Sequence, residues 1–273
     1  MDDFTELFSK KLEIAEKSTP PKKSGSKLIL VDEFTETKNT IIKDPIQIEK
    51  KPDINTEVLG KSFEMAICLL YTIVFDGKYK YSMSDATKLK KRIVKLKDVF
   101  PYYIRHTAKN GSQYDFTGLH DANIKLSAKT TKKDGKVCPQ VIGQPSKKKF
   151  CEFFKIDTAN SLDEIKEYIL ANVREMLAIY FNLTFDCPIV YYNQKTNKLI
   201  FIKKKQDIDW YKSIIAFSHI KKNKKWNESS TISINDITIG EFQIHTHRDC
   251  IKFRWAFEKL LTMNPDNFDI TEL

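Results

Sequence analysis

The sequence predicts an α/β fold, with α+β as the alternative, in which helices flank a mixed central β-sheet. Two periodicities lead to this prediction. Apolar residues recur at spacings of three and four near residues 63–74 and 165–180, which is typical of helices with one buried face. Apolar and polar residues alternate over 123–129 and 241–247, which is typical of strands. Because both kinds of segment are interspersed along the chain, we expect helices to enclose a sheet.

Composition divides the chain of 273 residues into two parts. Residues 1–53 are rich in charged residues and prolines. We expect them to form a flexible arm, because so little apolar area cannot offset the entropy lost on ordering. Residues 54–273 hold the periodic apolar positions and are expected to form one domain. Hydrophobic residues make up 41% of the chain, which is enough for a sizeable core.

Two helices are predicted at the start of this domain. The first is expected to end at Gly77, and the second to begin after Ser84, a favourable N-cap. The second helix is dense in lysine and arginine on its outer surface, which favours contact with a polyanion. The expected core positions of the two helices are Phe63, Ile67, Leu70, Val74, Leu89, Ile93 and Leu96.

The rest of the domain is predicted to hold two hairpins, a long helix and a closing strand. The first hairpin covers 114–130, and the second covers 189–203. Between them, Ser161 and Glu164 have the spacing of a capping box that opens a helix to about residue 182. The last strand is expected over 238–247, and a C-terminal helix over 249–263.

The formal net charge of +10 favours a polyanionic partner, nucleic acid before an anionic membrane. The longest apolar stretch, 63–75, is interrupted by Glu64 and is too short to cross a bilayer, so we expect no membrane partner. The first residues lack the pattern of a signal peptide. The five cysteines lack CxxC spacing and are expected to be free thiols. Together these features predict a cytoplasmic or otherwise intracellular protein, acting in a virion or host cell if it is viral.

The segment from Asp115 to Thr130 holds the side chains best suited to chemistry on a phosphodiester. Asp115 begins one strand, and Ser127 and Lys129 share one face of the next. Carboxylate oxygens suit a divalent cation such as Mg²⁺, which activates a bound water and offsets charge on phosphorus. A second carboxylate is expected from Asp121 beside the bend, from Glu64 in the first helix, or from Glu241 in the last strand.

The pattern resembles the nuclease core of type II restriction endonucleases of the PD-(D/E)xK superfamily, in a D…SxK variant. Ser127 stands where the family usually has an acid. The resemblance implies a restriction-endonuclease-like core in which Asp115, Asp121 and Glu64 hold Mg²⁺, for which Mn²⁺ can substitute. Lys129 would prepare the attacking water. It further implies a homodimer that cleaves double-stranded DNA, in most cases at a specific sequence.

Two further segments are expected to contact the DNA. Residues 137–150 follow the SxK strand and supply amides suited to adenine and lysines suited to phosphates. The strand from Glu241 has polar side chains on one face and basic residues after it. The expected contacts are Gln140, Gln144, Lys147, Lys148, Gln243, His245, His247, Arg248, Lys252 and Arg254.

Other interpretations of these residues remain open on the sequence. Glu241 and Gln243 could form the nuclease motif themselves, with Lys129 secondary. His245 and His247 could bind zinc, although no cysteine or third histidine is near them in sequence. The whole protein could instead be a non-catalytic basic nucleic-acid-binding protein, or a scaffold whose lysines reflect genome composition. Motifs of nucleotide-binding loops and nucleophile elbows are absent from the sequence.

Overall fold

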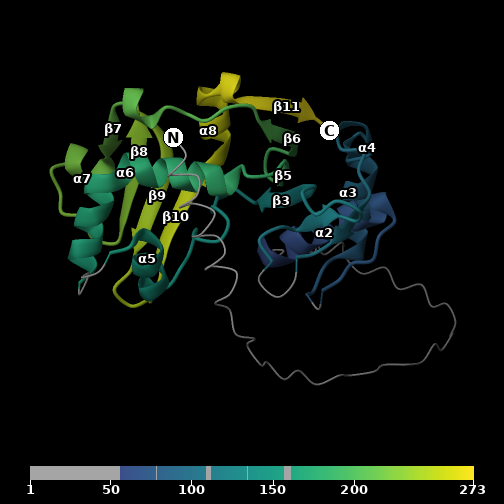
Figure 1. Cartoon of the computed structure of the whole chain (residues 1–273), viewed down its shortest axis with the longest axis horizontal. Coiled ribbons are helices and arrows are strands. Elements are labelled where there is room, and N and C mark those ends of the chain that lie inside the picture. Colours follow the sequence, from purple (N-terminus) through teal and green to yellow (C-terminus); the bar gives the residue numbers. More distant parts are fainter. Residues whose placement is uncertain (1–55, 78, 109–111, 134, 157–160) are drawn as a thin grey trace, which may run out of the picture.

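The computed structural model describes residues 56–77, 79–108, 112–133, 135–156 and 161–273. The predicted arm, 1–53, lies outside the described residues. Within them the chain forms two β-sheets that stand side by side, with helices packed on each (Figure 1). The predicted mixed sheet with flanking helices is confirmed, and a second sheet accompanies it.

The first sheet has six strands in the order β1-β2-β3-β5-β6-β11. It is mixed, because β3 and β5 are parallel while the other neighbours are antiparallel. Both predicted hairpins are confirmed, since β2 pairs with β3 and β5 pairs with β6. The strands are β1 (Ile104–His106), β2 (Phe116–Gly118), β3 (Lys125–Thr131), β5 (Ile189–Asn193), β6 (Lys198–Lys204) and β11 (Phe268–Glu272).

Helices α2 (Thr56–Tyr71), α3 (Met83–Arg92) and α4 (Leu96–Val99) cover one face of the first sheet. α2 buries the predicted apolar stripe as far as Leu70. Beyond it, Thr72 adopts a left-handed φ of 57°, and the helix ends before Gly77. The prediction for the end of this helix was therefore wrong, and Val74 is 82% exposed.

The N-terminus of α3 also differs from the prediction by two residues. Ser82, rather than Ser84, is the N-cap, and its side-chain oxygen accepts a hydrogen bond from the backbone N–H of Asp85. The buried positions were predicted correctly, because Leu89, Ile93 and Leu96 all lie in the core.

The second sheet has five antiparallel strands in the order β4-β10-β9-β8-β7. Strand β10, which lies between β4 and β9, occupies residues for which a helix was predicted, and only α8 (Phe257–Met263) is helical there. Ile251, Phe253 and Trp255 are buried in alternation with half-buried neighbours, which is a strand pattern. The strands are β4 (Lys136–Val137), β7 (Ile215–Phe217), β8 (Ser229–Ile234), β9 (Ile237–Ile244) and β10 (Ile251–Ala256).

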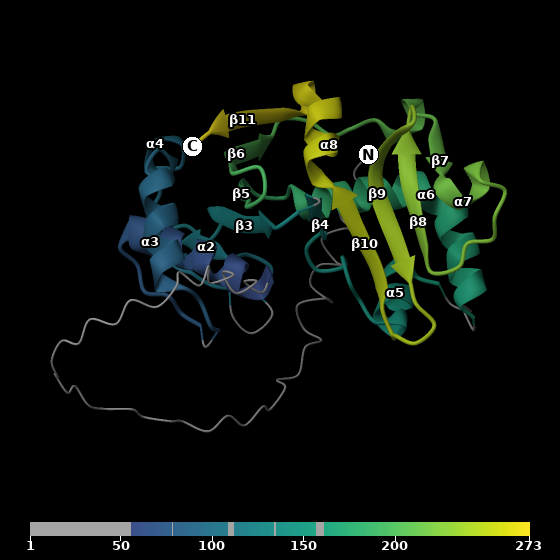
Figure 2. The same cartoon turned by 180° about the vertical axis from the view of Figure 1, so that it is seen from behind.

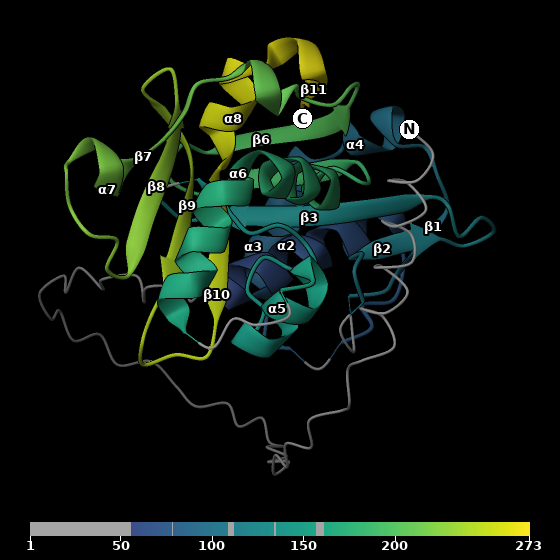
Figure 3. The same ribbon diagram turned by 60° about the vertical axis from the view of Figure 1, so that its left-hand side comes forward.

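The long helix α6 (Leu162–Thr184) contacts both sheets (Figure 3). The predicted capping box is present, with reciprocal hydrogen bonds between Ser161 and Glu164. On its buried face, Tyr180 stacks on Phe253 of the second sheet with ring centroids 4.4 Å apart. The remaining short elements are α5 (Lys147–Phe154), α7 (Ser218–Lys221) and the 3-10 turns Trp210–Lys212 and Pro265–Asn267.

The two sheets are joined most directly where β3 leads into β4 (Figure 2). β3 lies inside the first sheet, whereas β4 is the edge of the second. Side chains near the end of β3 therefore stand at the junction of the two sheets. Among the described residues, no helix combines the length and the apolar character that a membrane crossing needs.

Candidate active site

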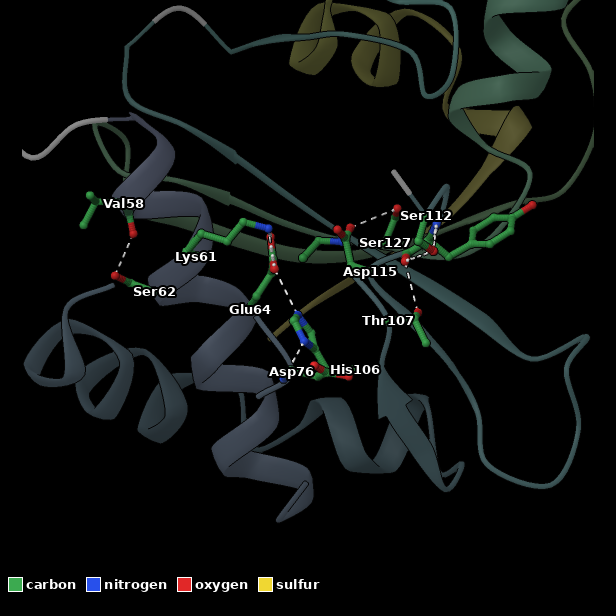
Figure 4. A network of polar contacts seen from close by, with 12 residues as sticks. Val58, Lys61, Ser62, Glu64, Asp76, His106, Thr107, Ser112, Asp115 and Ser127 are labelled. Atoms are coloured by element: carbon green, nitrogen blue, oxygen red, sulfur yellow. Dashed lines mark hydrogen bonds and ion pairs between the residues drawn. The ribbon is translucent and has the colours of Figure 1, made fainter. Parts of the chain in front are cut away.

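Asp115 lies directly before β2, and its carboxylate turns toward β3. Its Oδ2 accepts hydrogen bonds from the backbone N–H of Ala128 at 2.7 Å and from the hydroxyl of Ser127 at 3.2 Å (Figure 4). The pairing of β2 with β3 ends at Phe116 and Leu126. Beyond this point the Asp115 carboxylate, rather than a backbone carbonyl of β2, accepts the N–H of Ala128. No hydrogen bond from a described residue reaches Oδ1, which is the oxygen left for a ligand.

The surroundings of Asp115 are both buried and charged. Burial raises the pKa of this carboxyl, and the nearby carboxylate of Glu64 adds to the rise. The positive charges of Lys129 and Lys61 and the N–H of Ala128 oppose it without cancelling it. A carboxyl with its pKa shifted upward beside a second carboxylate is typical of a functional site, because a bound cation would stabilise both negative charges.

Glu64 reaches from α2 toward Asp115 and is held by two basic side chains (Figure 4). The Nζ of Lys61 lies 2.8 Å from each oxygen of Glu64, and the Nε2 of His106 lies 3.0 Å from Oε2. The backbone N–H of Asp76 donates to the Nδ1 of His106 at 3.1 Å. Since Nδ1 accepts that bond, the ring proton is on Nε2, and a neutral imidazole donates to the carboxylate.

Sequence reasoning missed Lys61 and His106. Lys61 stands one helical turn before Glu64, and that spacing was a signal for an ion pair. His106 is far from Glu64 in sequence, and it is fixed by stacking on Phe75 with centroids 4.6 Å apart and by an edge contact with Phe116. Nothing in the sequence relates His106 to Glu64.

Ser127, at the position of the usual second acid, is fully buried and joins a directed chain of hydrogen bonds. The Nε2 of Gln140 donates to the Oγ of Ser127 at 2.8 Å, and the hydroxyl of Ser127 donates to Asp115. Gln140 is 6% exposed, and its Oε1 is buried with no hydrogen-bond partner among the described residues. A buried amide oxygen without a donor costs about 1–3 kcal/mol, so a water or cation at this oxygen would relieve a real penalty.

Gln140, predicted to contact adenine, is buried beside Ser127. Its amide nitrogen is committed to Ser127, whereas a bidentate contact with a base needs both atoms of the amide free. The side chain belongs to the candidate active site instead.

Lys129 follows Ser127 by two residues on β3, so both side chains are on one face of the strand. Its charge lowers the pKa of Asp115 and that of Cys187, each of which burial raises more strongly. Among the described residues, Lys129 forms no ion pair or hydrogen bond through its ammonium group. A partly buried ammonium group beside a carboxylate is available to a water or a phosphate.

Asp121 was predicted as a metal ligand, but the structure does not bring it to Asp115. It is exposed in the turn of the hairpin, where its Oδ1 accepts the backbone N–H of Asn123 at 2.8 Å. Asp115 is bonded to the backbone of Ala128, whereas Asp121 is bonded to the backbone of Ile124. Ala128 and Ile124 are four residues apart, which is more than about 10 Å along a strand.

Glu241 is on β9, in the second sheet, where it neutralises two cations. The Nζ of Lys136 lies 3.0 Å away and the Nη2 of Arg254 lies 2.9 Å away. Burial tends to raise the pKa of Glu241, but the hydrogen bonds from Lys136 and Arg254 outweigh it and hold the pKa below its usual value. This carboxylate therefore links β4, β9 and β10, and the structure does not bring it to Asp115 as the predicted second carboxylate.

The structure places several of the predicted DNA contacts on the second sheet. Gln243 pairs with Lys252 across β9 and β10, beside the pair of Glu241 and Arg254. The charges of Lys252, Arg254 and Lys129 all lower the pKa of Cys138, although burial raises it more. Cys138 is therefore within electrostatic range of both Lys129 of the candidate active site and the basic residues of the second sheet.

The other predicted contacts gather at one end of this sheet. Gln144 and Lys148 are exposed, and Lys147, at the start of α5, donates its backbone N–H to Asp249 of the loop between β9 and β10. That loop carries Arg248, which is exposed. His245 and His247 do not lie free on a groove wall, because both approach Glu228, with Nδ1-to-carboxylate distances of 3.0 Å and 3.8 Å.

Comparison with known proteins identifies a relative. The chain is 47% identical over 219 residues to the type II restriction enzyme CviAII of Paramecium bursaria Chlorella virus 1. The aligned part covers 80% of this chain and 63% of that enzyme, so the chain spans less than two thirds of the relative it matches. No family model matches the sequence, and no solved structure matches it. The similarity to CviAII agrees with the resemblance indicated by Asp115, Ser127 and Lys129.

Proposed function

From its homology with a type II restriction enzyme, we propose that this chain is a divalent-metal-dependent endonuclease that cleaves double-stranded DNA at a specific sequence. The observation that carries the proposal is the cluster around Asp115, whose carboxylate is bonded to Ser127 and whose pKa responds to the charges of Glu64 and Lys129. We further propose Mg²⁺ as the cation, with Mn²⁺ able to replace it, and action inside a cell.

The oxygen atoms at the site fit such a cation. Oδ1 of Asp115 and Oε1 of Gln140 are both without a described hydrogen-bond donor, and the two side chains are joined through Ser127. Carboxylate and amide oxygens are the ligands that Mg²⁺ prefers, usually together with several waters. We therefore propose that Asp115 and Gln140 hold the cation, with Glu64 contacting it directly or through a water.

When bound, the cation would lower the pKa of a water ligand and offset the charge that develops on the phosphoryl oxygens. The remaining work belongs to side chains of this chain. Lys129 orients the attacking water and donates to a non-bridging phosphate oxygen. Ser127 keeps Oδ2 of Asp115 occupied, so that Oδ1 faces the ligand. Lys61 and His106 hold Glu64 in one orientation.

For the DNA, we propose the basic face of the second sheet, including Gln243, Lys252 and Arg254. Arg254 is already paired with Glu241, so its guanidinium is held in place before DNA binds. Cleavage of both strands needs two active sites, and the described residues contain one cluster of this kind. We therefore propose that the chain acts as a homodimer.

The test is incubation of the purified full chain with plasmid and viral DNA, in Mg²⁺ and in EDTA. Discrete fragments that require the cation are expected. The variant Lys129→Ala should lose cleavage by at least about 100-fold while still binding DNA. Lys133→Ala is the matched control, because Lys133 is an exposed lysine just beyond the end of β3.

A second candidate function is a non-catalytic nucleic-acid-binding protein, which the basic face of the second sheet would also suit. Intact DNA in both Mg²⁺ and Mn²⁺, together with binding that weakens steeply with salt, would replace the nuclease proposal with this one. Equal cutting by wild type and Lys129→Ala would reject the assigned site and leave the nuclease activity standing.

A further inference from the structure

Glu228, His245 and His247 form a second cluster of potential metal ligands, on the second sheet. One nitrogen of each imidazole and one carboxylate oxygen all lie within 4.8 Å of one another. Glu228 directly precedes β8, His245 directly follows β9, and His247 is in the loop that leads to β10. The backbone N–H of Ile244 donates to the carbonyl of Glu228 at 2.7 Å, so the two strand ends are fixed against each other.

The spacing of these atoms fits a small cation. The Nδ1 of His245 is 3.0 Å from one oxygen of Glu228, and the Nδ1 of His247 is 3.8 Å from the other. In a tetrahedral zinc site with bonds of about 2.1 Å, ligand atoms are about 3.4 Å apart. The two distances reach different oxygens of Glu228, and one ligand atom from each residue lies within 4.8 Å of the others. Side-chain adjustments of about 1 Å would therefore bring all three ligands to the ion.

A second observation also points to a ligand. The Nδ1 of His245 is buried and makes no hydrogen bond among the described residues, although Glu228 Oε2 is so close to it. This short contact lacks hydrogen-bond geometry, so the ring nitrogen stays unsatisfied beside a half-exposed carboxylate. A cation that accepts a lone pair from each would satisfy both atoms.

We propose that Glu228, His245 and His247 bind a transition-metal ion of the Zn²⁺ class, separate from the catalytic cation. Imidazole nitrogens favour Zn²⁺ and related ions, whereas Mg²⁺ favours oxygen, so the two sites select different metals. With three protein ligands, water completes the coordination. Glu228 is half exposed and His247 is 60% exposed, so the ion can enter from solvent.

The bound ion would fix the loop between β9 and β10. This loop carries the exposed Arg248, and its Asp249 accepts the backbone N–H of Lys147 at the start of α5. Figure 2 shows the loop beside α5. Metal binding therefore connects the ends of β8 and β9 to the segment that leads to α5, and it orders Arg248 without contacting it.

Zinc content after equilibrium dialysis of the full chain, in a large excess of Mg²⁺, tests the site. One zinc per chain is expected for the wild type, and zinc affinity should fall at least about 100-fold in His245→Ala and His247→Ala. His120→Ala is the matched control, because His120 is exposed on the first hairpin and should keep full zinc binding. Asp115→Ala should also keep it, which separates this site from the catalytic one.

A measurement on the wild type alone covers the case in which a variant fails to fold. Zinc should slow tryptic cleavage after Arg248 at least about tenfold, and it should raise Tm by about 5–10 °C at a hundredfold excess over Kd. No zinc bound by the wild type, or equal zinc in His245→Ala and wild type, would overturn the proposal and leave an ordinary histidine–glutamate ion pair. Neither result depends on DNA cleavage.

Discussion

The hydroxyl of Ser127 donates to the carboxylate of Asp115 at 3.2 Å, so the residue at the usual place of the second acid is bonded to the first acid. The serine cannot supply a negative charge, but it fixes which oxygen of Asp115 is free. Glu64, from a different element, brings the second negative charge close enough to raise the pKa of Asp115. Four predictions follow from this arrangement and from the ion pairs on the second sheet.

Asp115→Asn should abolish cleavage and stabilise the metal-free protein at pH 7. Burial raises the pKa of Asp115, so its ionised form is less stable in the folded state than in the unfolded state. The asparagine can still accept from Ala128. We expect a gain of about 0.5–2 kcal/mol in the free energy of unfolding, measured by urea denaturation in EDTA.

The sign of this effect fixes its pH dependence. A raised folded-state pKa means that wild-type stability is complete below the unfolded value of 3.8 and falls as pH rises toward the folded value. The advantage of Asp115→Asn should therefore shrink as pH is lowered toward 3.8. A variant that is less stable than wild type at pH 7 in EDTA would contradict this account.

Glu241→Gln should behave in the opposite way. The pKa of Glu241 is held low by Lys136 and Arg254, against the effect of burial, so its ion pairs stabilise the fold above the unfolded value of 4.5. We expect a loss of about 1–3 kcal/mol at pH 7 that disappears as pH falls below 4.5. Urea denaturation at pH 7 and pH 3.5 measures it, and an undiminished loss at the lower pH would reject the ionic origin.

Gln140→Leu should separate stability from metal binding. Removing an amide oxygen that has no donor stabilises the fold by up to about 1–3 kcal/mol, whereas the loss of the hydrogen bond to Ser127 destabilises it. The free energy of unfolding of the metal-free variant should therefore be within about 1 kcal/mol of the wild-type value. The Mg²⁺ concentration that gives half-maximal cleavage should rise at least tenfold. Gln206→Leu, at an exposed glutamine outside the site and the expected DNA contacts, is the control and should leave this concentration unchanged.

Glu64→Gln should lower cleavage by about 10–100-fold with little change in DNA affinity. Glutamine keeps the size of the side chain and can still accept from His106, but it pairs weakly with Lys61 and offers no negative charge to a cation. Cleavage assays over a range of Mg²⁺ and DNA concentrations distinguish a lower cleavage rate from a lower DNA affinity. Glu57→Gln, one residue into the same helix, is the control and should cleave as wild type does.

Local patterns predicted much of this fold correctly. The hairpin that carries Asp115 and Lys129, the capping box at Ser161 and the buried stripe of α6 depend on neighbours in sequence, and the structure contains each of them. The segment 249–256 was assigned to a helix because it precedes a true one, although Ile251, Phe253 and Trp255 alternate as in a strand.

The candidate site was only partly predictable, because its contacts join distant segments. Glu64 meets His106 across 42 residues, and Gln140 meets Ser127 only because the chain turns back after β4. Asp121 lies beside the predicted bend, and its carboxylate accepts a hydrogen bond within the turn, as carboxylates in tight turns usually do. Pattern analysis names the residue types that the chemistry needs, but the sheet pairing decides which of them meet.

The passage from β3 to β4 has a mechanical consequence. β3 ends at Thr131 in the six-stranded sheet, and β4 begins at Lys136 on the edge of the five-stranded sheet. A rotation of the five-stranded sheet must be absorbed by the short connection, or it moves the end of β3 that carries Lys129. For the proposed endonuclease, a duplex that rotates the five-stranded sheet would also displace Lys129, so a poorly fitting sequence would be bound with the ammonium group away from the phosphate.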